Sequence, residues 1–237
     1  MSAEAYVGSE LELFSAAHHW KAYFSDLIRP HLGVNVLEVG AGLGGTTKIL
    51  TQGHAGNWTC LEPDAALAGN ISQAIAAGNL PASCRVETGT LAALPEQERF
   101  DSILYIDVLE HIEDDAAEAA LAASRLNRGG KLIVLSPAYQ WLYSPFDQAI
   151  GHFRRYSKRT LLAAIPTSLA LTQFSYLDCV GLLASTGNRF VTRASNPTPA
   201  QIGLWDRVMV PMSRVLDPLV FNSFGKSVFG VWQEPNR

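Results

Sequence analysis

Apolar residues along the chain follow two periods, one typical of helices and one of buried strands. In residues 9–29 they recur every three or four positions after a serine, which predicts an amphipathic helix that ends at Pro30. From residue 34 onward, short apolar runs predict strands over residues 34–39, 58–63, 83–88, 100–107 and 131–137. Helices are predicted between them over residues 46–51, 64–77 and 113–126. Strands that alternate with helices predict an α/β fold with a doubly wound parallel sheet.

The rest of the chain is less regular. An aromatic and polar loop over residues 141–157 is followed by a predicted helix at 158–164 and predicted strands at 169–178 and 225–233. The apolar stretch between these two strands is interrupted by prolines. No linker-like segment divides the chain, so we predict one domain over residues 1–237, with an N-terminal helical cap at 1–30 and an inserted helical lid at 179–225.

Composition excludes several classes of protein. Apolar residues make up 48% of the 237 residues and charged residues 17%, which is too apolar for a disordered chain. The formal net charge of −4 argues against a broad nucleic-acid-binding surface. Cys60, Cys84 and Cys179 form neither a CxxC pair nor a zinc spacing, so we predict reduced core thiols and no metal centre. Since neither a signal-peptide pattern nor an apolar run of about 18 residues is present, a cytoplasmic location is predicted.

A glycine-rich segment, GAGLGG, begins at Gly40 between a predicted strand and a predicted helix. Gly40, Gly42 and Gly45 fit the GxGxxG spacing of dinucleotide-binding proteins, and Glu62 follows at a distance suited to a ribose, so a nicotinamide cofactor is one interpretation. Glu38 favours another, because a buried carboxylate is unfavourable beside a pyrophosphate but suits a cofactor with an ammonium and a sulfonium. Alternatively, the Glu38 carboxylate accepts a hydrogen bond from a donor in the protein core.

A series of motifs over residues 34–137 resembles class I S-adenosylmethionine (SAM)-dependent methyltransferases of the type 11/12 kind. The motifs are, in chain order, VLEVGAGLGGTT, CLEPD, FDSILYIDVLEHIEDD and LNRGGKLIVLSP. The tract DQAIGHFRRYS, from Asp147, resembles the GHxRRYS-type signature of a bacterial subgroup often encoded near polyprenol-type glycosyltransferases. The resemblance implies a Rossmann-like, seven-stranded mixed sheet of strand order 3-2-1-4-5-7-6 whose last strand is antiparallel. It also implies SAM as the cofactor and S-adenosylhomocysteine (SAH) as its product.

The same resemblance assigns cofactor contacts to particular residues. Gly40, Gly42 and Gly44 match the glycines that line the methionine part of SAM, and Glu38 matches the acid just before them. Glu62 matches the acid that binds the two ribose hydroxyls, since a carboxylate can accept both hydrogen bonds.

Further cofactor contacts are implied beyond the later strands. Pro63 matches a residue at the adenine edge, and Asp107 matches the residue beside the methionine ammonium and the methyl group. Many members of the family have an acid after the third strand that contacts the adenine amine. This chain has Gly89-Thr90 in that place, so Thr90, Leu91 or the backbone is expected to make the contact.

Methyl transfer to oxygen or nitrogen requires the acceptor to lose a proton, so a base is expected near the methyl group. His111 and His152 are the candidates, because imidazole titrates near neutrality. With Asp107 they form the predicted catalytic set, and structural packing is the alternative for each histidine.

A local basic cluster is expected to bind the acceptor. Arg154 and Arg155 suit a carboxylate or phosphate, and Tyr156 could stack on the acceptor or donate a hydrogen bond to it. The alternative is internal: the arginines pair with Asp147 or Glu113, and the tyrosine packs in the core.

Each of two apolar regions could either contribute to a binding site or pack in the core. The first helix carries Tyr6, Phe14, Trp20 and Tyr23 on one side, which either covers the cofactor or packs in the core. Residues 204–229 could wall an apolar acceptor pocket or lie on a membrane surface, but core packing is preferred.

The preferred function is SAM-dependent methylation of an oxygen on a small-molecule or lipid-linked acceptor. There are two alternatives. An NAD(P)-dependent oxidoreductase would be stabilised by NAD(H) and would not respond to SAH. A non-catalytic module would bind the cofactor but would show no turnover. Nucleic acid is not an expected partner, because the chain has no Asn/Asp-Pro-Pro-aromatic motif and no extended basic stretch.

Overall fold

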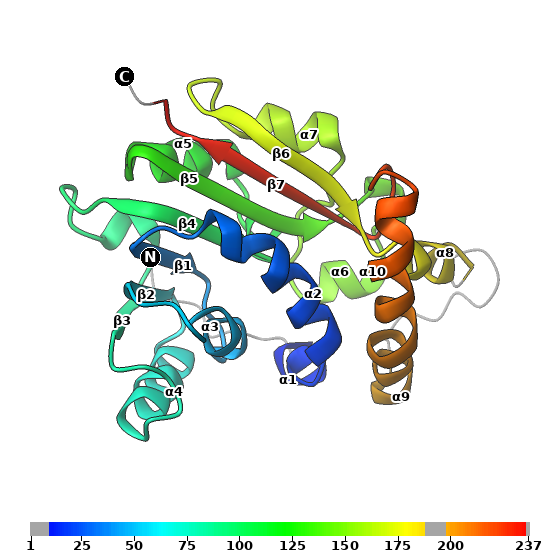
Figure 1. Cartoon of the computed structure of the whole chain (residues 1–237), viewed down its shortest axis with the longest axis horizontal. Coiled ribbons are helices and arrows are strands. Elements are labelled where there is room, and N and C mark those ends of the chain that lie inside the picture. Colours follow the sequence, from blue (N-terminus) through cyan, green and yellow to red (C-terminus); the bar gives the residue numbers. More distant parts are fainter. Residues whose placement is uncertain (1–9, 188–197, 236–237) are drawn as a thin grey trace.

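Seven strands form one mixed sheet in the computed structural model, which describes residues 10–187 and 198–235 (Figure 1). The strands are β1 (Asn35–Val39), β2 (Asn57–Glu62), β3 (Cys84–Thr88), β4 (Phe100–Ile106), β5 (Leu126–Pro137), β6 (Ala170–Leu177) and β7 (Ser227–Gln233). Their spatial order is β3-β2-β1-β4-β5-β7-β6. β1 pairs in parallel with β2 and β4, whereas β7 runs antiparallel to β5 and β6. The predicted fold class, strand order and antiparallel last strand are confirmed.

Helices cover both faces of this sheet (Figure 1). They are α1 (Glu10–Ser15), α2 (His18–Ile28), α3 (Gly45–Leu50), α4 (Ala65–Ala76), α5 (Asp115–Ser124), α6 (Pro145–Ala149), α7 (Lys158–Ala164), α8 (Cys179–Gly187), α9 (Pro199–Leu204) and α10 (Val210–Leu219). A π-helical turn, Trp205–Met209, joins α9 to α10. Residues of α2, α3, α4, α9 and α10 share one core with the sheet, and residues of α5 and α7 share the other.

The alternation of side chains along β1 explains why both faces are apolar. Val36 belongs to the first core, whereas Leu37 and Val39 belong to the second. Successive residues of a strand point to opposite faces, so a strand covered by helices on both sides needs apolar residues at nearly every position. The apolar runs in the sequence have this physical origin.

The N-terminal segment forms two helices, α1 and α2, where the sequence predicted one over residues 9–29. The backbone N–H groups of His19 and Trp20 donate to the carboxylate of Asp206, at 3.2 and 2.9 Å. A carboxylate that accepts from the first turn of a helix caps its N-terminus. Because this cap comes from a residue far along the chain, no local pattern marks the start of α2.

The helices between β6 and β7 are bound to α2. We call α8, α9, the π-helical turn and α10 the helical insertion. In α10, Asp217 is fully buried and accepts the Tyr23 hydroxyl at 2.8 Å. Asp217 also accepts the N–H groups of Asp178 and Cys179, at 2.7 and 2.9 Å. These contacts join the end of β6, the helical insertion and the N-terminal helix.

The aromatic residues of the first helices pack against the helical insertion. The ring centroids of Phe14 and Trp20 lie 6.0 and 5.8 Å from that of Trp205. This is the core packing that the sequence left open. Tyr6, like residues 188–197 of the predicted lid, lies outside the described residues. In the described part of the chain, no helix has the length and apolar character needed to span a membrane.

Candidate active site

The turn between β1 and α3 holds the glycines that were predicted to contact SAM. Gly40, Gly42 and Gly44 have φ angles of 66°, 57° and 72°, a backbone region that favours glycine. A Cβ atom on Gly40 would also lie 2.6 Å from a methyl carbon of Val108. On the other side, a methyl carbon of Leu11 in α1 would lie 3.4 Å from a Cβ on Gly42. The turn is therefore closely packed, and α1 reaches it.

The carboxylate of Glu62, at the end of β2, faces this turn. Its Oε2 accepts the Gly42 N–H at 2.8 Å, and its Oε1 accepts the Asp64 N–H at 3.0 Å. Burial raises the pKa of Glu62, and the two N–H groups act in the opposite direction. Each carboxylate oxygen can accept more than one hydrogen bond, so both retain capacity for a ribose.

The buried carboxylate of Glu38 is bound by the protein itself. Its Oε2 accepts hydrogen bonds from the Thr47 hydroxyl at 2.7 Å and the Trp58 indole N–H at 2.8 Å. Burial raises the pKa of Glu38 to about 7, although these two hydrogen bonds lower it. These are the core donors that the sequence left open as an alternative. The burial of Glu38 alone thus does not distinguish a sulfonium cofactor from a dinucleotide.

The residues predicted around the adenine differ in exposure. Pro63 and Thr90 are exposed, whereas the side chain of Leu91 is fully buried in the second core. The Gly89 N–H donates to the Glu62 carbonyl at 3.0 Å and joins the ends of β3 and β2. Any contact of Leu91 with a nucleoside must therefore use its backbone.

Asp107 directly follows β4, with a positive φ of 54°. Its N–H donates to the Leu135 carbonyl of β5 at 2.8 Å. Asp107 is exposed as a residue, but the protein atoms around its carboxyl desolvate it enough to raise the pKa of Asp107 to about 6. The nearby basic side chains of His152, Lys226 and Arg155 oppose this rise in the pKa of Asp107.

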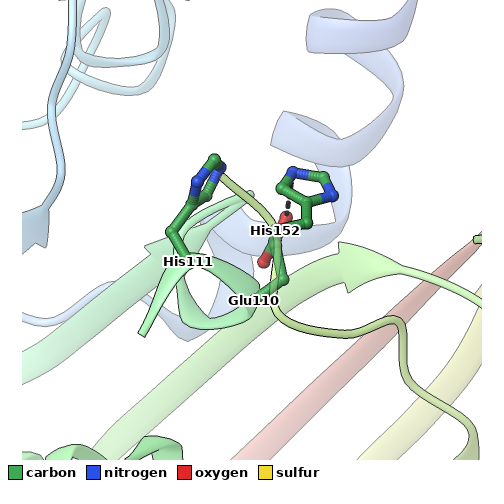
Figure 2. Close-up of side chains that lie close together, drawn as sticks. All are labelled: Glu110, His111 and His152. Carbon is green, nitrogen blue, oxygen red and sulfur yellow. Dashed lines mark ion pairs between the residues drawn. The ribbon is translucent and has the colours of Figure 1, made fainter. Parts of the chain in front are cut away.

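Glu110 and His111 lie in a 3₁₀ turn after β4, and His152, from the loop after α6, lies beside them. We call these three residues the Glu110 cluster (Figure 2). The rings of His111 and His152 meet edge to face, with centroids 4.4 Å apart. Glu110 is fully buried, and its Oε2 accepts the Ser136 hydroxyl at 3.0 Å. Its Oε1 has no hydrogen-bond partner among the described residues and lies 3.9 Å from His152 Nε2.

Asp147 orients His152 within this cluster. Asp147 Oδ1 lies 3.0 Å from His152 Nδ1, and the carboxylate also accepts two hydrogen bonds from the Arg155 guanidinium, at 2.7 and 3.0 Å. Burial acts to raise the pKa of Asp147, but the hydrogen bonds from His152 and Arg155 outweigh it and hold the pKa below its usual range. Burial lowers the pKa of His111 to about 4, with a contribution from His152, so His111 is neutral at pH 7. The structure thus brings both predicted bases together.

The remaining residues of the predicted acceptor site make internal contacts. Arg154 Nη1 lies 2.7 Å from an Asp115 carboxylate oxygen, and Nη2 donates to the Glu113 carbonyl at 2.6 Å. Tyr156 is buried, and its hydroxyl donates to Asp115 at 2.7 Å. Arg155 therefore pairs with Asp147, as the internal alternative expected, whereas Arg154 pairs with Asp115 and reaches only the backbone carbonyl of Glu113. The acceptor contacts of Arg154, Arg155 and Tyr156 stay predictions.

A match to a protein family decides between the cofactors that the site could take. The family model described as a methyltransferase domain matches residues 10–167, about two thirds of the chain. The chain belongs to this family and is a class I SAM-dependent methyltransferase. SAM is thus the cofactor of the methyltransferase, and a nicotinamide-dependent oxidoreductase is not favoured.

Solved structures share the fold of the methyltransferase at low sequence identity. Geranyl diphosphate C-methyltransferase from Streptomyces coelicolor A3(2), in complex with Mg²⁺, geranyl diphosphate and SAH, is 12% identical with a TM-score of 0.65, covering 98% of this chain and 87% of that chain. Coclaurine N-methyltransferase, bound to N-methylheliamine and SAH, is 15% identical with a TM-score of 0.60, covering 90% and 71%. The [4+2]-cyclase SpnF is 14% identical with a TM-score of 0.66, covering 99% and 96%.

These structural similarities establish the fold alone. Their identities are low, and one of the proteins is a cyclase, so the same fold carries different chemistry. No curated protein sequence matches the chain. The assignment as a methyltransferase therefore depends on the family model.

Two lysines of the methyltransferase lie at the site and were not predicted. The Nζ of Lys21, on α2, would lie 3.0 Å from a Cβ on Gly45, so its ammonium reaches the glycine turn. The Nζ of Lys226, just before β7, lies 5.0 Å from the centroid of the Trp205 ring. Lys226 is also near enough to Asp107 to lower that carboxyl's pKa. Neither lysine belongs to a motif, because packing between distant elements places both.

Core packing, the preferred interpretation of residues 204–229, is only partly correct. Trp205 and Val210 are buried, but Leu219 and Phe221 are 69% and 88% exposed. We call the exposed apolar residues from α9 to the turn after α10 the α10 apolar face. Its residues are Leu204, Val208, Met212, Val215, Leu216, Leu219 and Phe221. Most of these positions recur every three or four residues, so they lie along one side of the helix, and a row of exposed apolar side chains is typical of a contact with an apolar partner.

Proposed function

We propose that the methyltransferase transfers the methyl group of SAM to an oxygen of a small-molecule or lipid-linked acceptor in the cytoplasm. One observation carries this proposal: Asp107, Glu110 and His111 follow β4 at the sheet edge where the glycine turn follows β1, and His152 meets them there from the loop after α6. A hydroxyl nucleophile must lose a proton as it attacks. Asp107, His111 and His152 are the residues we propose to assist that loss.

Residues at the ends of β1, β2 and β4 are proposed to hold SAM. Glu62 would bind the ribose hydroxyls, and the glycine turn would line the methionine part. The ammonium of Lys21 suits the methionine carboxylate, and the carboxylate of Asp107 suits the methionine ammonium. With both ends of methionine held, the methyl group would be directed toward the Glu110 cluster.

The reaction is an in-line displacement. The acceptor oxygen forms a bond to the methyl carbon while the carbon–sulfur bond breaks, and the bonding electron pair stays on sulfur to give SAH. Positioning of the two reactants supplies much of the rate in such a reaction. We therefore expect groups that orient His152 to affect turnover even where they do not touch the acceptor.

The proposal is tested with a panel of hydroxyl and amine acceptors, both soluble and polyprenyl-linked. The purified methyltransferase is incubated with SAM, and SAH formation and the methylated atom are determined by mass spectrometry and NMR. We expect methyl ethers or esters. Transfer found only at nitrogen or carbon would contradict the oxygen acceptor. In a parallel thermal-shift panel, SAH is expected to raise the melting temperature and NAD(H) is not.

The α10 apolar face supports the lipid-linked acceptor. We propose that it contacts a membrane surface that holds such an acceptor, since exposed apolar residues on a helix can insert among lipid headgroups. Flotation with anionic phospholipid vesicles should carry the wild-type protein, and Leu219→Asp with Phe221→Asp should abolish it. Wild-type protein that stays with the unbound fraction would contradict this contact.

A further inference from the structure

We propose that the Glu110 cluster binds a divalent transition-metal cation, although no metal centre is predicted from the sequence. Glu110 and His111 are adjacent in the 3₁₀ turn after β4, and His152 comes from the loop that follows α6. Figure 2 shows the Glu110 carboxylate beneath the His152 ring. The His111 ring lies to the left of that carboxylate in this view. The inference deepens the proposed function, on which it rests, because the cation would lie where the acceptor oxygen is expected.

The ligand atoms are close enough to share one cation. One nitrogen or oxygen of each residue lies within 4.8 Å of the others, and His152 Nε2 is 3.9 Å from Glu110 Oε1. In a tetrahedral site with bonds of about 2.0–2.2 Å, ligand atoms lie roughly 3.4 Å apart. Rotations of the side chains that move these atoms by less than about 1 Å would therefore bring all three to bonding distance of one cation.

The Glu110 oxygen that accepts no hydrogen bond from any described residue points independently to a cation. Glu110 is fully buried, and among the described residues its Oε1 accepts no hydrogen bond. A buried carboxylate oxygen without a partner is unfavourable, and a bound cation would satisfy it. Two imidazoles and one carboxylate are a ligand set for zinc, iron, cobalt or nickel rather than for magnesium or calcium, which prefer oxygen alone.

The residues behind the cluster are arranged as the outer shell of a metal site. His152 contacts Asp147 through Nδ1, which leaves Nε2 directed toward Glu110. The other Glu110 oxygen accepts the Ser136 hydroxyl. Metal-bound histidines commonly hydrogen-bond a carboxylate through their second nitrogen, and metal-bound carboxylates are hydrogen-bonded in turn.

A cation at this point would assist the proposed transfer. With three protein ligands it keeps an open position, which the acceptor hydroxyl can occupy. Binding lowers the pKa of the hydroxyl, and its proton passes to water. The oxygen then attacks the methyl carbon of SAM, so the products are the methylated acceptor, SAH and one proton.

The test is a titration of tag-free, chelator-treated methyltransferase with Co²⁺, followed by its visible absorption spectrum. We expect about one Co²⁺ per chain, displaced by Zn²⁺ and not by equal Mg²⁺. Glu110→Gln and His152→Asn should each weaken Co²⁺ binding by at least about 100-fold, and Asp147→Asn by about 10–100-fold. The matched controls are Glu118→Gln, which keeps its contact with the Tyr105 hydroxyl, and His54→Asn beside Gly33, and both should bind Co²⁺ as the wild type does.

Several outcomes would overturn the proposal. Wild-type protein with no stoichiometric Co²⁺ site would do so, and so would Glu110→Gln that binds Co²⁺ unchanged. Circular dichroism and SAH calorimetry establish that each variant is folded. Turnover that survives complete removal of metal would contradict the role of the cation and leave the methyltransferase assignment intact. A bound cation without transfer to any hydroxyl would instead contradict the proposed acceptor.

Discussion

Replacing Asp217 with alanine should weaken the contact between the helical insertion and α2. Asp217 is fully buried and accepts the Tyr23 hydroxyl and the N–H groups of Asp178 and Cys179. Alanine supplies no acceptor, so three buried donors lose their partner. The change therefore acts on several hydrogen bonds, although it alters a single side chain.

The magnitude follows from these donors. A buried donor without a partner costs about 1–3 kcal/mol, so three predict a loss of about 3–9 kcal/mol in the free energy of unfolding. Relaxation and removal of the buried negative charge return part of this cost, so we expect about 3–4 kcal/mol. That is a large fraction of the roughly 5–15 kcal/mol that stabilises a folded domain. Tyr23→Phe removes one donor only and should cost about 1 kcal/mol.

The same two helices provide a matched control. Asp26 of α2 and Arg214 of α10 form an ion pair, but their side chains are 53% and 50% exposed. Exposed ion pairs contribute about 0–1 kcal/mol, so Asp26→Ala should change stability little. Urea unfolding followed by circular dichroism and tryptophan fluorescence measures all of these variants. An Asp217→Ala loss no larger than that of Asp26→Ala would refute the reasoning.

Other predictions concern the cofactor and acceptor sides. Because burial raises the pKa of Glu38 from 4.5 to about 7, the folded state holds this proton more strongly, and wild-type stability should fall by about 3 kcal/mol as pH rises through that window. Glu38→Gln should remove that fall, and equal pH dependence of urea unfolding in both proteins would contradict it. Glu62→Ala should weaken SAH binding about 100-fold, through two lost charge-assisted hydrogen bonds, and unchanged calorimetric affinity would exclude a ribose contact. Gly42→Val should abolish SAH binding, since the turn has φ of 57° there and Leu11 lies close. His152→Ala should lower kcat with little change in SAH affinity, and full activity would remove it from the catalytic set.

Much of the fold could be predicted because its causes are local. The strands of a sheet covered on both faces are apolar at successive positions, and the predicted helix at 158–164 matches α7, which begins after a Ser157 capping box. The break between α1 and α2 could not be predicted, because its cause is a carboxylate from the helical insertion. The exposure of Phe221 also departs from expectation, since hydrophobicity alone does not say whether a face is covered.

The candidate site also contains some residues that could be predicted from the sequence and others that could not. Gly40, Gly42 and Glu62 could be predicted, since each lies at or just after the end of a strand that a short apolar run marks in the sequence. The role of Glu110 was missed, because in sequence it resembles the exposed acids that follow it. Its unpartnered oxygen and its distance to His152 exist only after folding. The sequence could not decide between two partners for Arg155, because a guanidinium binds a carboxylate of the acceptor and a carboxylate of the protein equally well.

The cap on α2 also sets an order of events during synthesis. Asp206 lies 186 residues after Trp20, so the start of this helix lacks its acceptor until nearly the whole chain has left the ribosome. Contacts between distant residues form late, because a long loop must close first. In pulse-labelled hydrogen exchange during refolding, the amides of His19 and Trp20 should gain protection after those of the central strands. Nascent chains that stop short of residue 206 should leave them unprotected.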